Sequence, residues 1–419
     1  MKRTILILFL FSVLLAAAQD IEIYFSGKTY GEITPCSCPV HPDGGISRRI
    51  KFLTDRKSPD TLFIDTGGIL SGGYGESREE HIAAERDEVL IDGYKRIGYD
   101  AISPGVSEFT HSSEYIRKLS EGLGKILVCT NYTGKTGYLN KYIVKQIGDT
   151  RVLIFGVFIP DENFPVHEDF PRKDFADPAE SVKNELINIR RPDDLVIVIG
   201  SISEDQARKL AGLLPNVHII LFGKNEILQK EPEQVKKTYL AASNYQSKKI
   251  GRLLCQFRNG KPIDIKCGFT RMSPATGEIA DIYIRSLQVC RQESVKCPHY
   301  VYFYLGPDYL KYEKKIKESL KVLLKKGIER KVIFSDFKDE DAIYFDMMNN
   351  ELSKYIKIRP SKMKQKEYKA EMSRTKNEHE KANFGTALPG VYTGLRYFSL
   401  EDLDTDSLIW DMRVLGLLK

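Results

Sequence analysis

The sequence is short of the side chains and patterns that mark several protein classes. It has one tryptophan, seven histidines and seven cysteines among 419 residues. Charge of one sign does not dominate, because 63 basic residues are mixed with 57 acidic ones. Nucleic-acid binders carry a sharper basic bias, so we expect no nucleic-acid partner. Past the N-terminus no apolar run reaches the roughly 18 residues of a membrane-spanning helix. What remains is a globular composition, 42% hydrophobic and 29% charged, with length for two domains.

The N-terminus has the three parts of a secretory signal peptide. Lys2 and Arg3 are followed by an apolar run over 5–15 and by small residues at 16–18. We therefore predict a signal peptide over 1–18 and an exported protein, periplasmic or extracellular. No cysteine follows the small residues, so no lipid anchor is expected, and we expect no membrane insertion after cleavage.

Apolar runs that alternate with longer mixed segments predict an α/β domain over 19–267. The expected strands include 21–25, 61–66, 151–158, 194–200 and 217–223, and the expected helices include 79–97 and 112–121. A helical connector is predicted over 268–299. A smaller α/β domain is predicted over 300–419, with strands at 301–305, 331–336, 390–393 and 395–398 and helices at 311–326, 340–355 and 402–417.

Several segments of the first domain resemble a known family in order and spacing. They are FSGKTYGEI from Phe25, LFIDTGG from Leu62, GYDAISPGVSEF from Gly98, DLVIVIGSISED from Asp194 and HIILFGKNE from His218. Together they resemble the calcineurin-like metallophosphoesterases, in particular the bacterial periplasmic 5′-nucleotidase and UDP-sugar hydrolase branch. The resemblance implies an α/β fold, a four-layer αββα sandwich.

The resemblance also locates the family's metal ligands and its catalytic His, which corresponds to Ser107, and this chain differs there. The family has, in chain order, Asp, His, Asp, Asn, His, His, His and His. The corresponding residues here are Lys28, Tyr30, Gly68, Val106, Ser107, Ser201, Lys224 and Glu226. Only Glu226 keeps a side chain that readily ligates metal, and none of the seven histidines falls at a ligand position. A lysine ammonium about 4 Å from a unit positive charge costs about 4 kcal/mol at an effective dielectric near 20, so Lys28 and Lys224 would repel metal ions.

These differences favour a catalytically inactive protein, a pseudoenzyme with no cofactor. We expect it to act as a binding or scaffolding component of the cell envelope, with an envelope protein as partner. Lys28 and Lys224 could bind an anion such as phosphate, or each could pair with Glu108, Glu226 or Asp65 in a sealed cluster. The alternative is a divergent phosphoester hydrolase that binds divalent metals through Glu226 with Asp65, Glu108 or His111.

The cysteines raise a third hypothesis, a thiol or copper-handling protein. Cys36 and Cys38, with His41 nearby, could hold Cu(I) or Zn, form a strained disulfide, or serve as ordinary structural cysteines. Cys290 and Cys297 are the expected disulfide.

The predicted C-terminal domain resembles a thioredoxin-like domain by its order of strands and helices. After its first strand, where a redox C-x-x-C would stand, the sequence has Gly306-Pro307-Asp308-Tyr309. This resemblance implies a thioredoxin-like fold without disulfide exchange at that position.

Overall fold

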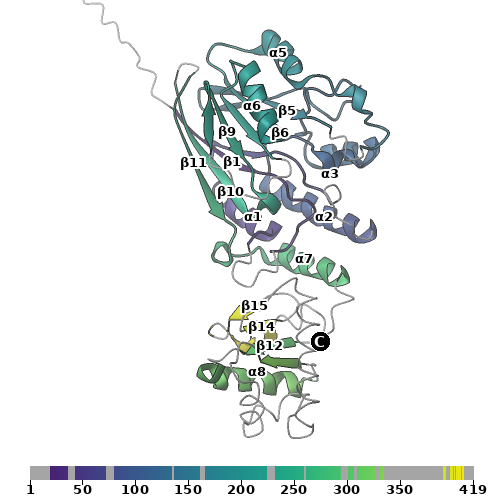
Figure 1. Ribbon diagram of the computed structural model, residues 1–419, viewed down its shortest axis with the longest axis vertical. Helices are drawn as coiled ribbons and strands as arrows, with labels where there is room; N and C mark the ends of the chain where they lie inside the picture. The colour runs from purple at the N-terminus through teal and green to yellow at the C-terminus, as the bar shows by residue number, and fades with distance from the viewer. Residues whose placement is uncertain are drawn as a thin grey trace, which may run out of the picture.

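The computed structural model describes most of the first 293 residues and parts of the remainder. The described residues are 19–35, 43–71, 80–134, 136–160, 166–223, 232–258, 261–293, 301–305, 309–326, 330–334, 390–392, 397–399, 401, 403–406 and 408–409. Within them the strands form two larger sheets and one smaller sheet (Figure 1).

The first sheet joins strands from both ends of the predicted first domain. Its order is β11 (Lys261–Arg271), β10 (Lys249–Arg258), β1 (Gln19–Ser26), β2 (Thr61–Asp65) and β3 (Ala101–Ile102). The strands β1, β2 and β3 run parallel, whereas β10 is antiparallel to β1 and to β11.

The second sheet is formed by the middle of the chain. Its order is β4 (Ile143–Ile147), β5 (Thr150–Phe158), β6 (Leu195–Ser201), β7 (Ile219–Phe222), β9 (Thr238–Ala242) and β8 (Glu233–Val235). The strands β5, β6, β7 and β9 are parallel, and an antiparallel strand closes each edge.

The apolar side chains form three cores, one between the two larger sheets and one under the helices on each outer face. The direction of the side chain alternates along each strand and decides which core it enters. In β6, Ile197 and Ile199 face the first sheet, while Val196 and Val198 face helices. In β1, Ile23 likewise lies in the core between the sheets. Successive strand residues point to opposite faces, so a sheet covered on both faces has continuously apolar strands.

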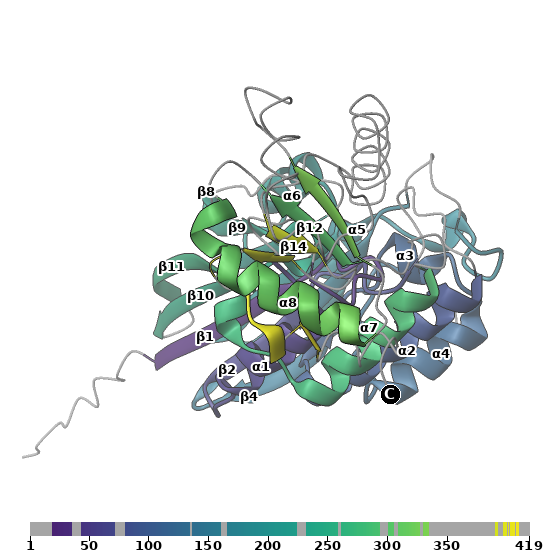
Figure 2. The ribbon, with the colours of Figure 1, turned by 90° about the horizontal axis from the view of Figure 1, so that it is seen from below.

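Helices cover both outer faces and complete four layers (Figure 2). The helices α1 (Ile46–Thr54), α2 (Glu80–Ile97), α4 (Ser113–Gly122) and α7 (Ala280–Glu293) pack on the first sheet; α5 (Pro178–Ile189) and α6 (Glu204–Leu213) pack on the second. A short helix, α3 (Val106–Phe109), follows β3. The predicted α/β class and αββα sandwich are confirmed.

Local capping fixes where the outer helices begin. The Asp177 side chain accepts a hydrogen bond from the Glu180 amide, and Pro178 occupies the first turn of α5. Ser203 and Gln206 form a reciprocal capping box at α6. Both arrangements satisfy amide groups that a helix start leaves without intrahelical partners.

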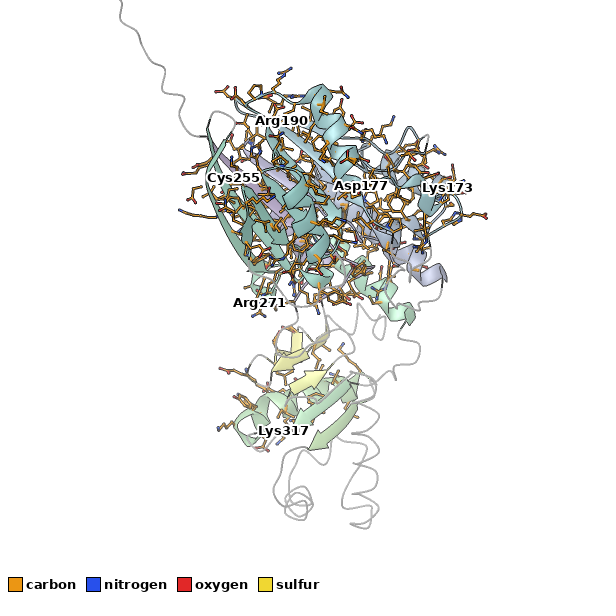
Figure 3. The ribbon with its side chains drawn as sticks, turned by 45° about the horizontal axis from the view of Figure 1, so that its top comes forward. Lys173, Asp177, Arg190, Cys255, Arg271 and Lys317 are labelled. Carbon is orange, nitrogen blue, oxygen red and sulfur yellow. The ribbon has the colours of Figure 1, made fainter. Side chains whose placement is uncertain are left out.

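The predicted connector contributes to the first core. Ile282 and Val289 of α7 are buried with residues of α1 and α2, and β11 continues through Arg271, past residue 267. Arg190, at the end of α5, and Arg271 lie at opposite ends of the two-sheet unit (Figure 3). Among the described helices, none combines the length and apolar character that a bilayer crossing requires.

The smaller sheet has the order β13 (Arg330–Phe334), β12 (Val301–Leu305), β14 (Gly390–Tyr392) and β15 (Tyr397–Ser399). The strands β12 and β13 are parallel, and the other two pairings are antiparallel. The helix α8 (Glu313–Lys325) buries Ile316, Leu320 and Leu323. The predicted helix over 340–355 lies outside the described residues, as does most of the one over 402–417.

Candidate functional site

The carboxyl ends of the parallel strands of both sheets bring the predicted site positions together. The loop after β1 pairs with the turn after β2, since the Lys28 amide donates to the Gly67 carbonyl at 2.7 Å and the Tyr30 amide to the Gly68 carbonyl at 2.8 Å. From the second sheet, Ser201 lies against Gly105, where an added Cβ would be 2.9 Å from the Ser201 side chain. Ligands of α/β folds bind at this end of the strands.

The two loops hold an unusual backbone conformation. Lys28 and Tyr30 have φ of 54° and 49°, and Gly67 and Gly68 have φ of 94° and 73°. The left-handed region costs a residue with a side chain about 1–2 kcal/mol, so the paired loops must stabilise Lys28 and Tyr30 there. A Cβ at Gly68 would lie 2.7 Å from Cε1 of the Tyr30 ring, which therefore packs against the turn.

Glu108 is a fully buried carboxylate surrounded by hydrogen-bond donors. Its Oε1 accepts from the amides of Ile69 (2.7 Å) and Leu70 (3.0 Å) and from the Ser107 hydroxyl (2.9 Å). Its Oε2 accepts from the amides of Gly68 (3.0 Å) and Gly105 (2.7 Å). Five donors exceed the roughly four lone-pair positions of a carboxylate, so no position is left for a further ligand, and Glu108 connects the turn after β2 to α3.

Asp65, at the end of β2, is also a buried carboxylate that accepts internal hydrogen bonds. Its Oδ2 accepts from the hydroxyls of Ser26 (2.6 Å) and Tyr94 (2.9 Å), and its Oδ1 accepts from the Gly67 amide (2.8 Å). Burial raises the pKa of Asp65 to about 6, against the lowering effects of these bonds and of the Arg49 charge.

Behind Asp65 lies a buried polar network that the sequence did not predict. Arg49 of α1 is 0% exposed, and its Nη1 donates to the hydroxyls of Thr29 (3.0 Å) and Tyr94 (2.9 Å). The rings of Tyr94 and Tyr99 stack at 4.7 Å, and Tyr99 shares a 2.6 Å hydrogen bond with Ser26. Burial raises the pKa of Tyr99 to about 12, so the phenol stays protonated.

Lys28 is buried at 1% exposure, and its side chain crosses to the second sheet. A Cβ at Gly223, at the end of β7, would lie 3.2 Å from Lys28 Cε. Amides and hydroxyls already engage Asp65 and Glu108, two of the three carboxylates predicted as partners of Lys28. Lys224 and Glu226 lie outside the described residues, so the predicted anion site and the sealed cluster both stay predictions.

The alternative ligands Asp65, Glu108 and His111 belong to three separate networks. The His111 ring stacks on Tyr115 at 4.4 Å, and its Nε2 lies 4.0 Å from Asp87 Oδ2. Burial raises the pKa of Asp87 to about 7 and lowers that of His111. The structure therefore does not assemble the three side chains as one ligand set.

The described residues do not fit a two-metal centre of the kind that the family resemblance implies. Each such ion needs several carboxylate, imidazole or amide ligands. The carboxylates at this end already accept internal hydrogen bonds, and no three His, Cys, Asp or Glu of the described chain gather as metal ligands. A metal ion here would have to break the Asp65 or Glu108 networks.

The cysteine predictions fall mostly beyond the described residues. Cys36, Cys38 and His41 all lie there, and so does Cys297, the predicted partner of Cys290. Cys290 itself accepts a hydrogen bond from Arg86 Nη2 at 3.3 Å. The metal or thiol site and the disulfide both stay predictions.

The comparisons with known proteins give matches by fold. No family model matches the chain, and no curated protein matches it by sequence. The 5′-nucleotidase precursor from Thermus thermophilus has a TM-score of 0.55 and 19% identity, over 69% of this chain and 61% of its own. SoxB, a sulfate thiohydrolase from the same organism, has a TM-score of 0.54 and 14% identity, over 73% and 68%.

A third structure extends the same likeness. A putative 5′-nucleotidase from Staphylococcus aureus has a TM-score of 0.53 and 15% identity, over 68% of this chain and 60% of its own. The chain thus spans about three-fifths of the length of the two nucleotidases. At these identities the likeness concerns the fold.

Proposed function

The described part of the chain has the fold of the metallophosphoesterase superfamily, and on that premise we propose that it is a non-catalytic member that works by binding. The observation that carries the proposal is that no carboxylate, imidazole or amide side chain stands at the described family positions, which are Lys28, Tyr30, Gly68, Val106, Ser107 and Ser201. The nearby Glu108 carboxylate does not replace them, because it accepts five internal hydrogen bonds. A group engaged in this way stabilises the fold and is not available as a ligand.

The free energies involved support this proposal. A hydrogen bond to a charged group contributes about 1.5–3 kcal/mol, and a buried donor left without a partner costs about 1–3 kcal/mol. Turning Glu108 toward a metal ion would strand four backbone amides, and whole domains are stable by only about 5–15 kcal/mol. The loop conformation of Lys28 and Tyr30 depends on the same turn.

We further propose that the protein is exported and serves as a binding or scaffolding component of the cell envelope, with an envelope protein as partner. The basic, apolar and small-residue pattern of 1–18 supports export. The word precursor in the name of the Thermus nucleotidase is consistent with it. N-terminal sequencing of protein secreted by its native host tests this: a mature chain beginning near residue 19 is expected, and an intact Met1 in a cytosolic fraction contradicts it.

The smaller unit is proposed to be thioredoxin-like, without disulfide exchange. The strand order β13-β12-β14-β15, with one parallel and two antiparallel pairings, supports this. A purified chain that reduces insulin disulfides in the presence of dithiothreitol faster than dithiothreitol alone would contradict the proposal.

A phosphoester screen tests the non-catalytic role. Purified full chain is incubated with 5′-AMP and with bis(p-nitrophenyl) phosphate in the presence of Mg²⁺, Mn²⁺ or Zn²⁺. We expect no turnover above the protein-free control. Metal-dependent turnover that disappears in an Asp65→Asn variant with an unchanged thermal melt would refute the proposal in favour of a divergent hydrolase.

A further inference from the structure

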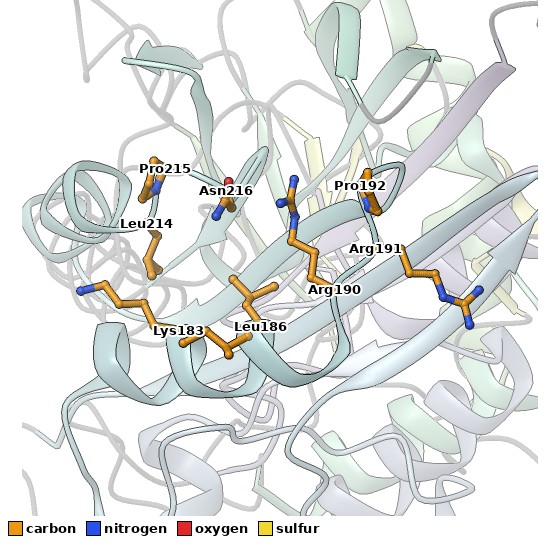
Figure 4. A pocket seen from close by; sticks show the side chains of 9 residues that line it. Lys183, Leu186, Arg190, Arg191, Pro192, Leu214, Pro215 and Asn216 are labelled. Atoms are coloured by element: carbon orange, nitrogen blue, oxygen red, sulfur yellow. The ribbon is translucent and has the colours of Figure 1, made fainter.

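A groove lies at the opposite ends of the second sheet's strands from the residues discussed above. It has a volume of about 510 Å³ and is formed by the end of α5 and by the segments that lead into β6 and β7 (Figure 4). Its apolar lining includes Leu186 of α5 and Leu214 and Pro215, which follow α6. This volume is within the range of about 300–1,000 Å³ in which proteins bind small ligands or short peptide segments.

The groove is also basic. Lys183, Arg190 and Arg191 line it, and Figure 4 shows the Arg190 side chain between Asn216 and Pro192. The Arg190 Nε is buried and has no hydrogen-bond partner among the described residues. Lys183 is paired with Glu180 at 2.7 Å, and Figure 4 shows Arg191 turned away from Leu214, Pro215 and Asn216, so Arg190 is the principal cation turned to the groove.

Arg190 is not explained as a residue that caps the last carbonyl groups of α5. Basic side chains are common at helix carboxyl ends, where they bind the last carbonyl groups. Here Arg151 has that role, because its Nη1 donates to the Ile189 carbonyl at 3.1 Å and pairs with Asp194 at 2.6 Å. Asp194 also accepts from the Arg191 amide at 2.7 Å, so this carboxylate is engaged elsewhere.

Exposed aliphatic side chains surround the same groove. Ile187 of α5 is 81% exposed, the most of any large hydrophobic residue that the structure describes as exposed. Leu213, which ends α6 next to the groove, is 42% exposed. Burial of these side chains by a partner would remove apolar surface from water and would favour binding.

We propose that this groove binds an extended segment of a partner protein in which a carboxylate side chain neighbours an aliphatic one. The carboxylate accepts from the Arg190 guanidinium, and the aliphatic side chain packs on the exposed Ile187 and Pro215, beside the buried Leu186 and Leu214. Charge complementarity identifies the occupant as acidic, and the apolar lining selects an aliphatic neighbour over a wholly charged segment. The inference gives the proposed binding role its surface, and it rests on the proposed function only for that role.

Fluorescent octapeptides test the inference by anisotropy with the full chain. One peptide alternates aspartate and leucine; the matched controls alternate lysine and leucine, or aspartate and serine. The first should bind, and each control should bind at least about tenfold more weakly, since like charges or lost apolar burial both cost more than about 1.4 kcal/mol. No binding of the first peptide at millimolar concentration, or equal binding of the lysine peptide, would overturn the proposal.

Variants locate the binding. Arg190→Glu and Ile187→Asp should each weaken the aspartate–leucine peptide about tenfold or more. Lys95→Glu on α2 and Leu324→Asp on α8, exposed positions that do not line the groove, should leave it unchanged. Ile187 is so exposed that its variant should fold, which keeps the test valid if the Arg190 variant does not. Unchanged affinity in folded Ile187→Asp protein would place the peptide elsewhere and refute the proposal.

Sedimentation velocity and the phosphoester screen distinguish this proposal from self-association and from the proposed loss of catalysis. Sedimentation velocity should show no self-association; a dimer that Ile187→Asp dissociates would make a second copy the occupant and overturn the peptide assignment. Peptide binding by a chain that hydrolyses phosphoesters would refute only the non-catalytic role. If the chain hydrolyses no phosphoester and also binds no peptide, only the proposal that the groove binds a partner segment is refuted.

Discussion

Replacement of Glu108 by glutamine should destabilise the fold strongly. Glutamine has almost the same shape, but one carboxylate oxygen becomes an NH₂ donor. The best orientation keeps the amide oxygen toward Ile69, Leu70 and Ser107 and turns the NH₂ group toward the amides of Gly68 and Gly105. At least two charge-assisted hydrogen bonds are then lost. At about 1.5–3 kcal/mol each, the free energy of unfolding should fall by about 3–6 kcal/mol.

Urea denaturation followed by far-UV circular dichroism measures this loss. The Glu108→Gln midpoint should fall far below that of the wild type, since a domain is stable by only about 5–15 kcal/mol. Glu168→Gln, at an exposed position, is the matched control and should leave the midpoint unchanged. A loss below about 1 kcal/mol, the value of a single ordinary hydrogen bond, would show that the five contacts do not hold the turn.

Two other predictions concern the same end of the sheets. Gly68→Ala should lower the thermal midpoint, because Gly68 has φ of 73° and its new Cβ would lie 2.7 Å from the Tyr30 ring; Gly137→Ala, with open space around it, should not, and equal midpoints would refute the close packing. Stability should also depend on pH. Burial raises the folded-state pKa of Asp65 to about 6 and of Asp87 to about 7, from an ordinary 3.8, so the folded state holds protons more tightly within this window. The free energy of unfolding should therefore fall as pH rises from about 4 to 7 and then level off. Urea midpoints across this range should fall less steeply in Asp87→Asn, and an identical slope would contradict the assignment.

Much of the fold follows from the sequence because burial imposes a repeating pattern. The apolar run over 151–158 became β5 (Thr150–Phe158), and the helix expected over 79–97 became α2 (Glu80–Ile97). Pro178 and Ser203, residue types that favour helix starts, lie where α5 and α6 begin. The short strands β8 and β4 were not predicted, since partly exposed edge strands lack a continuous apolar run.

The site was predictable as a set of positions and not as a set of contacts. The family spacing brought Lys28, Gly68 and Ser201 to the carboxyl ends of the strands, where the structure has them. The donors around Glu108 are mostly backbone amides, which a sequence does not display. The Gly105–Glu108 spacing was a detectable sign, because a Glu three residues after a helix N-cap commonly accepts from the N-cap amide.

The buried network around Arg49 was missed for a different reason. Arginine is almost never fully buried, so an Arg in an amphipathic helix predicts an exposed position. Here the hydroxyls of Thr29 and Tyr94 accept hydrogen bonds from the Arg49 Nη1, and the guanidinium carbon lies 5.4 Å from the centre of the Tyr94 ring. Arg49 and its two partners come from three separate segments, and their convergence depends on the tertiary fold.

The central claim is that the carboxyl ends of the strands do not form a metal centre, and metal stoichiometry tests it most directly. The full chain is dialysed against Mn²⁺ or Zn²⁺ and analysed by mass spectrometry for metal, beside a Cys36→Ser/Cys38→Ser variant that removes the predicted thiol site. We expect no stoichiometric metal in the variant and no hydrolysis of 5′-AMP by either protein. Two metal ions per chain in the variant, accompanied by hydrolysis, would contradict the claim.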